Sequence, residues 1–132
     1  MRLLLATMAL LLTASAAPAA TNVELLHGTV RSGAHSAGGR AAVVLTSGKR
    51  VLTLRRFSIA PGPKVRVYLV PRSVKGDGDV TRDYKDLGDL KGSKGNQQYA
   101  IPGSVDLRRY RSVIFWCVPF TTTLARANLT PS

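Results

Sequence analysis

Cysteine, methionine and histidine are scarce in this chain of 132 residues, and their scarcity limits the chemistry open to it. Cys117 is the only cysteine, so no disulfide can form within the chain and the fold must depend on its core. Both methionines, Met1 and Met8, lie at the N-terminus. One cysteine and two histidines, His27 and His35, cannot supply the four ligands of a structural zinc site without carboxylates.

Combinations of residues that serve catalysis are also missing. A nucleophile needs a neighbouring base and an orienting group, and the spacing does not bring Cys117 together with His27 or His35. No glycine-rich phosphate loop occurs, and the 7 acidic residues are too scattered to indicate a paired general acid and base. We therefore expect no stand-alone catalytic activity.

Cofactor motifs are equally sparse. Covalent haem would need C-x-x-C-H, which is absent, whereas a non-covalent haem could use His27 or His35 as one axial ligand. The sequence therefore leaves any cofactor unknown. An acidic cluster could offer oxygen ligands to calcium, but it lacks the spacing of an EF-hand loop and basic residues interleave with it. We favour a solvated loop and predict no metal site there; the cluster comprises Asp77, Asp79, Asp83 and Asp86.

A long hydrophobic run occurs only at the N-terminus. Leu3–Leu12 is apolar and follows Arg2, and small residues fill 13–20, which is the order of a secretory signal peptide. We favour cleavage after Ala19, with Ala16 as the alternative. The run is shorter than the about 20 apolar residues that span a bilayer, so an uncleaved anchor is the less favoured interpretation. The sequence thus predicts a secreted, extracytoplasmic protein (periplasm or cell envelope if bacterial), with a signal peptide over 1–19 and one domain over 20–132.

Positive charge dominates the chain, with 19 basic and 7 acidic residues and a formal net charge of +12. For an exported protein, anionic envelope polymers or lipid headgroups are nearer partners than nucleic acid, which we consider an improbable partner. The basic residues are scattered along the chain, and this favours the alternative of a basic surface that aids solubility.

Glycine and proline recur at short intervals between segments rich in Val, Leu, Ile, Tyr and Thr. This pattern predicts an all-β, single-domain sandwich or barrel of about seven to nine short, mostly antiparallel strands. The segment 64–70 alternates, so that Val65, Val67 and Leu69 face a core. The runs 41–46 and 51–56 form a hairpin around Ser47-Gly48-Lys49.

Three further segments complete the expected organisation. Ser112–Val118 is apolar on both faces, which predicts a strand buried from both sides that ends near Pro119. Phe120–Leu129 is expected to be the last strand. The polar stretch Arg72–Asp86 is interpreted as a surface excursion that carries one helical turn.

Three ordered motifs resemble those of the DM-thirteen domain, an extracytoplasmic β domain found alone and beside DOMON and cytochrome b561-type modules. They are F-x-x-x-x-G-P-x-V-x-V-Y-L over 57–69, L-G-x-L-K-G followed by G-x-Q-x-Y over 87–99, and W-C-x-x-F over 116–120. The resemblance covers essentially the whole mature chain. Its family-motif residues here are Gly62, Pro63, Tyr68, Leu90, Gly92, Gly95, Gln97, Tyr99, Trp116 and Phe120.

The resemblance implies a redox or electron-transfer module in which Cys117 is the redox-active group. Because no DOMON or cytochrome module is fused to this chain, the redox partner would be a separate protein. A reactive thiol should be exposed or lie beside a positive group, whereas Cys117 stands in the most apolar strand, two residues before Pro119. The alternative is a non-enzymatic envelope binding or adhesion module in which Cys117 fills the core. A disulfide between two chains also stays open.

Overall fold

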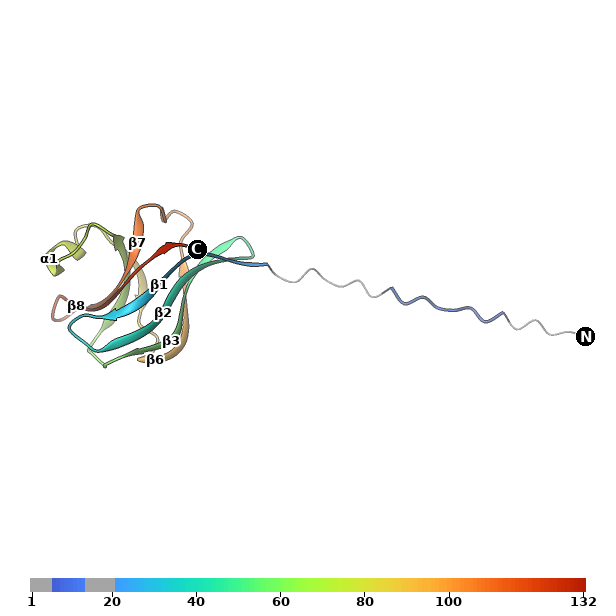
Figure 1. The fold of residues 1–132 in the computed structure, drawn as a ribbon, viewed down its shortest axis with the longest axis horizontal. Helices are drawn as coiled ribbons and strands as arrows, with labels where there is room; N and C mark the ends of the chain where they lie inside the picture. The colour runs from blue at the N-terminus through green and yellow to red at the C-terminus, as the bar shows by residue number, and fades with distance from the viewer. Residues whose placement is uncertain (1–5, 14–20) are drawn as a thin grey trace, which may run out of the picture.

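The computed structural model describes residues 6–13 and 21–132 of the chain (Figure 1). Residues 6–13 form neither helix nor strand and lie away from the domain. The two cleavage positions considered for the signal peptide, Ala16 and Ala19, lie outside the described residues. Within the described ranges, no helix has the length and apolar character needed to cross a membrane.

The domain is all-β, as the sequence predicts, and its nine strands fall within the expected number. One short helix interrupts them, at the place where the sequence predicts a helical turn. The elements are β1 (Asn22–Ser32), β2 (Ala37–Thr46), β3 (Lys49–Ile59), β4 (Val65–Pro71), α1 (Asp77–Val80), β5 (Lys85–Asp89), β6 (Lys94–Ile101), β7 (Tyr110–Cys117), β8 (Thr122–Asn128) and β9 (Thr130–Pro131).

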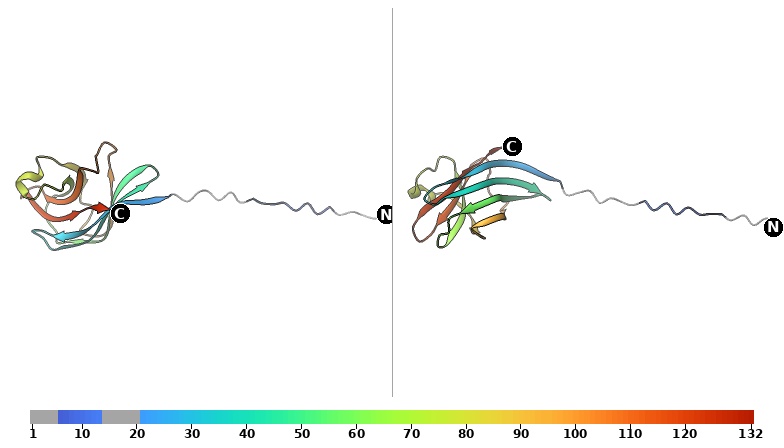
Figure 2. Two further views of the ribbon diagram at one scale, coloured as in Figure 1. Left: turned by 45° about the horizontal axis from the view of Figure 1, so that its top comes forward. Right: turned by 60° about the horizontal axis from the view of Figure 1, so that its bottom comes forward.

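The strands form a nearly closed antiparallel barrel, in the order β5-β4-β7-β8-β1-β2-β3-β6, with β9 beside β1. The long strand β1 joins the two walls, because residues 22–29 pair with β2 and residues 30–32 pair with β8. In the right-hand view of Figure 2, β1, β2 and β3 lie side by side and curve around the core. This curvature brings the two edge strands, β5 and β6, toward each other.

The segment Leu90–Ser93, which we call the closing segment, lies between these two edges. The Leu90 amide donates to the Val65 carbonyl at 2.9 Å, and the Ile59 amide donates to the Ser93 carbonyl at 2.9 Å. The connection between β5 and β6 is therefore tied to the start of β4 on one side and to the end of β3 on the other.

The predicted hairpin is confirmed. Thr46 of β2 pairs with Lys49 of β3, so Ser47 and Gly48 make a two-residue turn, with φ of 49° and 73°. Positive φ at both central residues is the requirement of a type I′ turn, whose twist matches that of the two strands.

Strand β7 is central to the barrel and pairs with β4 on one side and β8 on the other. Its inward side chains are Val113, Phe115 and Cys117, which join the main core inside the barrel. Phe115 stacks on Phe57 of β3, with ring centroids 4.9 Å apart, so the ring of Phe115 links the two walls.

The outer face of β7 is buried as well, which confirms the prediction of a strand covered on both sides. Ile114 and Trp116 pack there with Tyr68 and Val70 of β4, and two valines from the segment 72–84 complete this outer cluster: Val74 and Val80. Figure 1 shows α1 standing outside the barrel beside this region.

The outer cluster corrects two details of the sequence-based expectation. Strand β4 buries both faces, not only the face with Val65, Val67 and Leu69. The excursion Arg72–Asp86 is polar overall but buries its two valines, and its last two residues begin β5. Two isolated valines in a polar stretch form no period, so the local pattern could not show that they cover a second core.

Gly28 provides a test of how β1 passes between the two walls. A Cβ atom at Gly28 would stand 2.1 Å from the carbonyl oxygen of Asn128, so the backbone would have to move. We predict that Gly28→Ala lowers the free energy of unfolding by about 1–3 kcal/mol, as over-packing does. Gly38→Ala is the matched control, because no atom lies within 4 Å of an added Cβ there. It should be neutral or stabilising by about 0.4–1 kcal/mol. Denaturant unfolding measures both, and equal losses would contradict this account.

Candidate functional site

Cys117 is the last residue of β7, where its ladder partners are Val65 of β4 and Thr122 of β8. The strand ends there because Pro119, two residues later, has no amide proton to continue the ladder. The side chain points into the barrel, and the residue is only 1% exposed. The sole thiol of the chain therefore lies at one end of the barrel, under the loop that joins β3 to β4.

That loop, residues 60–64, covers the thiol and accepts a hydrogen bond from it; we call it the covering loop. Cys117 Sγ donates a hydrogen bond to the carbonyl oxygen of Pro63 at 3.3 Å. The loop is tied down by the amide of Val118, which donates to the Lys64 carbonyl at 3.2 Å. Pro63 and Lys64 are themselves exposed, so a single loop separates the sulfur atom from the surface. The Gly62-Pro63 motif and the W-C-x-x-F motif thus meet at the sulfur.

Gly62 is required by a close approach in the same loop. An added Cβ would lie 3.1 Å from Leu124 Cδ1 and 3.2 Å from His35 Cε1. His35 is fixed there because its Nδ1–H donates to the Ala60 carbonyl at 2.7 Å, while His27 Nδ1 is paired with the hydroxyl of Ser132. In the described part of the chain, no hydrogen bond connects Cys117 to either histidine. The structure therefore does not assemble a thiol–imidazole pair.

A surface hollow of about 400 Å³ flanks the covering loop. Pro61, Gly62 and Lys64 line it on the loop side, and Leu90 and Ser93 line it from the closing segment. Cys117 is not among its lining residues. A molecule seated in this hollow would rest against the loop that covers the thiol, without touching the sulfur.

Two apolar side chains are exposed just after Cys117: Val118 is 39% exposed and Phe120 is 69% exposed. The turn that presents them is fixed by Thr122, whose hydroxyl donates to the Phe120 carbonyl at 2.7 Å. Phe120 is thus the one aromatic side chain of the family motifs that core packing does not explain.

One aromatic residue of the first motif, Tyr68, meets one of the third, Trp116, on the outer face of the barrel. The ring centroids of Tyr68 and Trp116 are 6.3 Å apart, and the ring of Tyr84, tilted by 32°, lies 4.4 Å from that of Tyr68. Burial raises the pKa of Tyr68, and the carboxylate of Asp86 adds to this effect. Tyr84 has no signal in the sequence, because a lone aromatic residue in a polar stretch shows no periodicity.

The second motif builds a polar clasp that fixes the closing segment onto β6. Tyr99 donates its hydroxyl proton to Gln97 Oε1 at 2.6 Å and accepts the Lys91 amide proton at 2.9 Å. Gln97 Nε2 in turn donates to the Gly92 carbonyl at 2.6 Å. Burial raises the pKa of Tyr99, which keeps its hydroxyl protonated as a donor. Gly95, the second residue of β6, has φ of 96°, a backbone conformation that favours glycine.

Three of the four acidic residues of the excursion bind partners from other parts of the fold, while Asp79 pairs with Arg82 inside it. Asp83 accepts the hydroxyl proton of Tyr110 at 2.6 Å and a guanidinium proton of Arg109, and these bonds lower its pKa. Asp77 accepts the Thr123 amide proton at 3.0 Å, and Asp86 accepts from a guanidinium of β4. Among the residues that the structure describes, no group of three or more His, Cys, Asp or Glu side chains comes together.

Comparison with known proteins gives one match. The family model described as Electron transfer DM13 matches residues 29–129. The matched span contains all three sequence motifs, the covering loop and Cys117. No curated protein and no solved structure matches the chain.

The two phenylalanines that flank Cys117 should differ in their structural importance. Phe115 is 0% exposed, so Phe115→Ala should lower the free energy of unfolding by about 3–5 kcal/mol. Phe120→Ala, at a side chain that is 69% exposed, should change it by no more than about 0.5 kcal/mol. Urea unfolding of the two variants beside the unmodified protein measures this difference. A loss above about 2 kcal/mol in Phe120→Ala would assign that ring to the core instead.

Proposed function

The chain belongs to the Electron transfer DM13 family, and from this premise we propose that it is an extracytoplasmic electron-transfer module whose redox group is the thiol of Cys117. One observation carries the proposal: the only sulfur atom of the domain is bonded to Pro63, so two family motifs converge on it. The extracytoplasmic location rests on the signal-peptide pattern of residues 1–19.

The chemistry that suits a single thiol is exchange with separate partner proteins. The Cys117 thiolate attacks a disulfide of an acceptor protein, forming a mixed disulfide and releasing one acceptor thiolate, which takes up the proton that Cys117 lost. A dithiol of a donor protein then reduces the mixed disulfide, restoring the Cys117 thiol and freeing the second acceptor thiol. The donor leaves as a disulfide, so two electrons and two protons pass from donor to acceptor.

Access to the sulfur requires the covering loop to open. At 1% exposure, Cys117 cannot meet a partner disulfide in the closed state. Local opening of a loop costs less free energy than unfolding of the whole domain, and residues 60–64 are held by few backbone bonds. A partner protein could contact the exposed ring of Phe120, which follows Cys117, and the hollow that flanks the covering loop.

The test is the rate at which an alkylating reagent labels Cys117 across a range of denaturant concentrations. If the loop opens locally, the labelling rate below the unfolding transition should be nearly independent of denaturant, because little surface is exposed. A rate that rises steeply from zero denaturant, in step with global unfolding, would mean that the thiol is reached only in the unfolded chain and would reject the redox role.

A loop variant sharpens this experiment. Pro63→Ala keeps the carbonyl that accepts from Cys117 but frees the φ angle of the loop, so the open loop gains entropy. We expect native-state labelling to become several-fold faster while its dependence on denaturant stays shallow. Because the unfolded chain gains the same freedom, the free energy of unfolding should fall by about 0.4–1 kcal/mol. Cys117→Ser serves as the unlabelled control. Labelling of Pro63→Ala that rises steeply with denaturant, as global unfolding does, would contradict local opening.

The burial of Cys117 favours a second function, a non-enzymatic envelope binding module in which the cysteine fills the core. In that case Cys117→Ser should lower the free energy of unfolding by about 1–3 kcal/mol, because it buries a hydroxyl group at an apolar site. Cys117→Ala should retain binding of inorganic polyphosphate, weakening with salt as charge-driven binding does. Absence of polyphosphate binding at low salt would remove the support for this function, which rests on the net charge of +12.

A further inference from the structure

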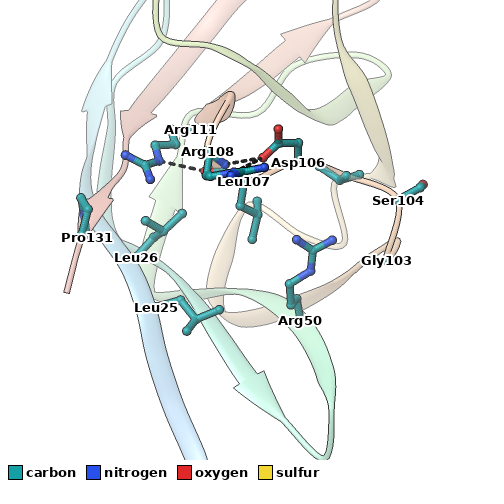
Figure 3. Close-up of a pocket in the computed structure, with 11 residues that line it drawn as sticks. Leu25, Leu26, Arg50, Gly103, Ser104, Asp106, Leu107, Arg108, Arg111 and Pro131 are labelled. Carbon is teal, nitrogen blue, oxygen red and sulfur yellow. Dashed lines mark hydrogen bonds and ion pairs between the residues drawn. The ribbon is translucent and has the colours of Figure 1, made fainter.

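The end of the barrel opposite Cys117 carries a hollow of about 570 Å³ (Figure 3). Strand β7 runs from Tyr110 to Cys117, and the hollow lies at its Tyr110 end, where residues 103–108 cross the mouth of the barrel. Its volume falls within the range of about 300–1,000 Å³ typical of small-molecule sites. Neither the redox step nor the second candidate function uses this hollow.

Apolar side chains form the floor of the hollow. Leu26 and Val105 are each 4% exposed and belong to the main core, while Leu25 and Leu107 are half-buried and border the hollow above it. Figure 3 shows Leu26 and Leu107 in the middle of the hollow, with Leu25 below them. A ligand seated here would meet leucine side chains over most of its length.

Arginines surround this floor. Figure 3 shows Arg50 and Arg111 on opposite sides of the hollow, with Arg108 near the latter. Arg50 Nη2 donates to the Pro102 carbonyl at 2.8 Å, and Arg111 Nε donates to the Leu107 carbonyl at 2.8 Å. These bonds fix the two guanidinium groups and leave their other N–H donors without a protein acceptor in the described part of the chain.

The single carboxylate of the hollow does not neutralise these two arginines. Asp106 accepts the backbone amide proton of Arg108 at 2.9 Å and faces its Nε at 3.4 Å. Within residues 6–13 and 21–132, neither Arg50 nor Arg111 forms a salt bridge. The hollow therefore combines an apolar floor with positive charge that lacks a counterpart.

We propose that this hollow binds a single-chain amphiphile with an anionic head group. The alkyl chain would cover Leu25, Leu26 and Leu107, and the head group would accept hydrogen bonds from Arg50 and Arg111. Guanidinium groups match phosphate and carboxylate oxygens in pairs, and such charge-assisted bonds are the strongest a protein offers. The hollow lies at the opposite end of the barrel from Cys117, so binding there does not depend on a redox role of the thiol.

The test is titration of the protein with dodecyl phosphate below its micelle concentration, followed by calorimetry and by NMR shifts of the leucine methyl groups. We expect saturable binding that shifts Leu25, Leu26 and Leu107. Arg50→Gln should weaken binding about tenfold or more, because a charged hydrogen bond is lost. Arg108→Gln should also weaken it, and this variant is safe for the fold because its side chain is 89% exposed.

Matched ligands and a matched variant decide what the hollow recognises. Arg82→Gln removes the same charge from an exposed arginine that pairs with Asp79, away from the hollow, and this variant should bind dodecyl phosphate as the unmodified protein does. Inorganic phosphate has the head group without the alkyl chain, and dodecyl maltoside has the alkyl chain with a neutral head group. Each of these two ligands should bind at least about tenfold more weakly than dodecyl phosphate. If Arg82→Gln weakened dodecyl phosphate binding as much as Arg50→Gln does, the net charge of the protein and not the hollow would account for the effect, and the proposal would be wrong. Equal binding of either matched ligand, or no saturable binding at all, would overturn the proposal.

Discussion

The burial of β7 on both faces is the constraint on which the rest of the structure depends. Its backbone is fully paired between β4 and β8, so its side chains must be covered from two directions. The inner face is covered by the opposite wall of the barrel, through the stacking of Phe115 on Phe57. The outer face is covered by the excursion between β4 and β5, through Val74 and Val80. The excursion therefore adds a second apolar layer to a small domain that has no disulfide to stabilise it.

Because β7 runs through the barrel from Tyr110 to Cys117, its two ends lie at opposite ends of the barrel. At the end of β7, the ladder stops at Cys117 and a short loop covers the sulfur atom. At its start, residues 103–108 cross the mouth and leave a hollow lined by leucine and arginine. Arg111, which lines the hollow, and Cys117 are six residues apart on β7, which is about 20 Å at about 3.3 Å per residue. A molecule bound at one end does not contact the other.

Local patterns predicted the parts of this arrangement that have a period or a turn signal. Alternation identified β4, the uniformly apolar run identified β7 as the central strand, and Ser47-Gly48 identified the hairpin turn. The closing segment could not be found in this way, because its bonds join Leu90 to Val65 and Ser93 to Ile59, which are distant in sequence. For the candidate site, the sequence singles out one residue, Cys117, and says nothing of its surroundings. Its acceptor, Pro63, is separated from it by 54 positions, and no local signal links a thiol to a particular carbonyl.

Backbone strain around Cys117 bears on how the thiol could be reached. Lys64 in the covering loop and Thr121 in the turn after β7 have φ of 44° and 45°, in the left-handed region that disfavours residues with a side chain. Each such residue stores about 1–2 kcal/mol, and for a β-branched threonine the conformation is a clear outlier. Opening the loop would release the strain at Lys64 and break the bond from Val118 that holds it. The strain therefore offsets part of the cost of that opening, while the ladders of β4 and β8 keep the remainder of β7 in place.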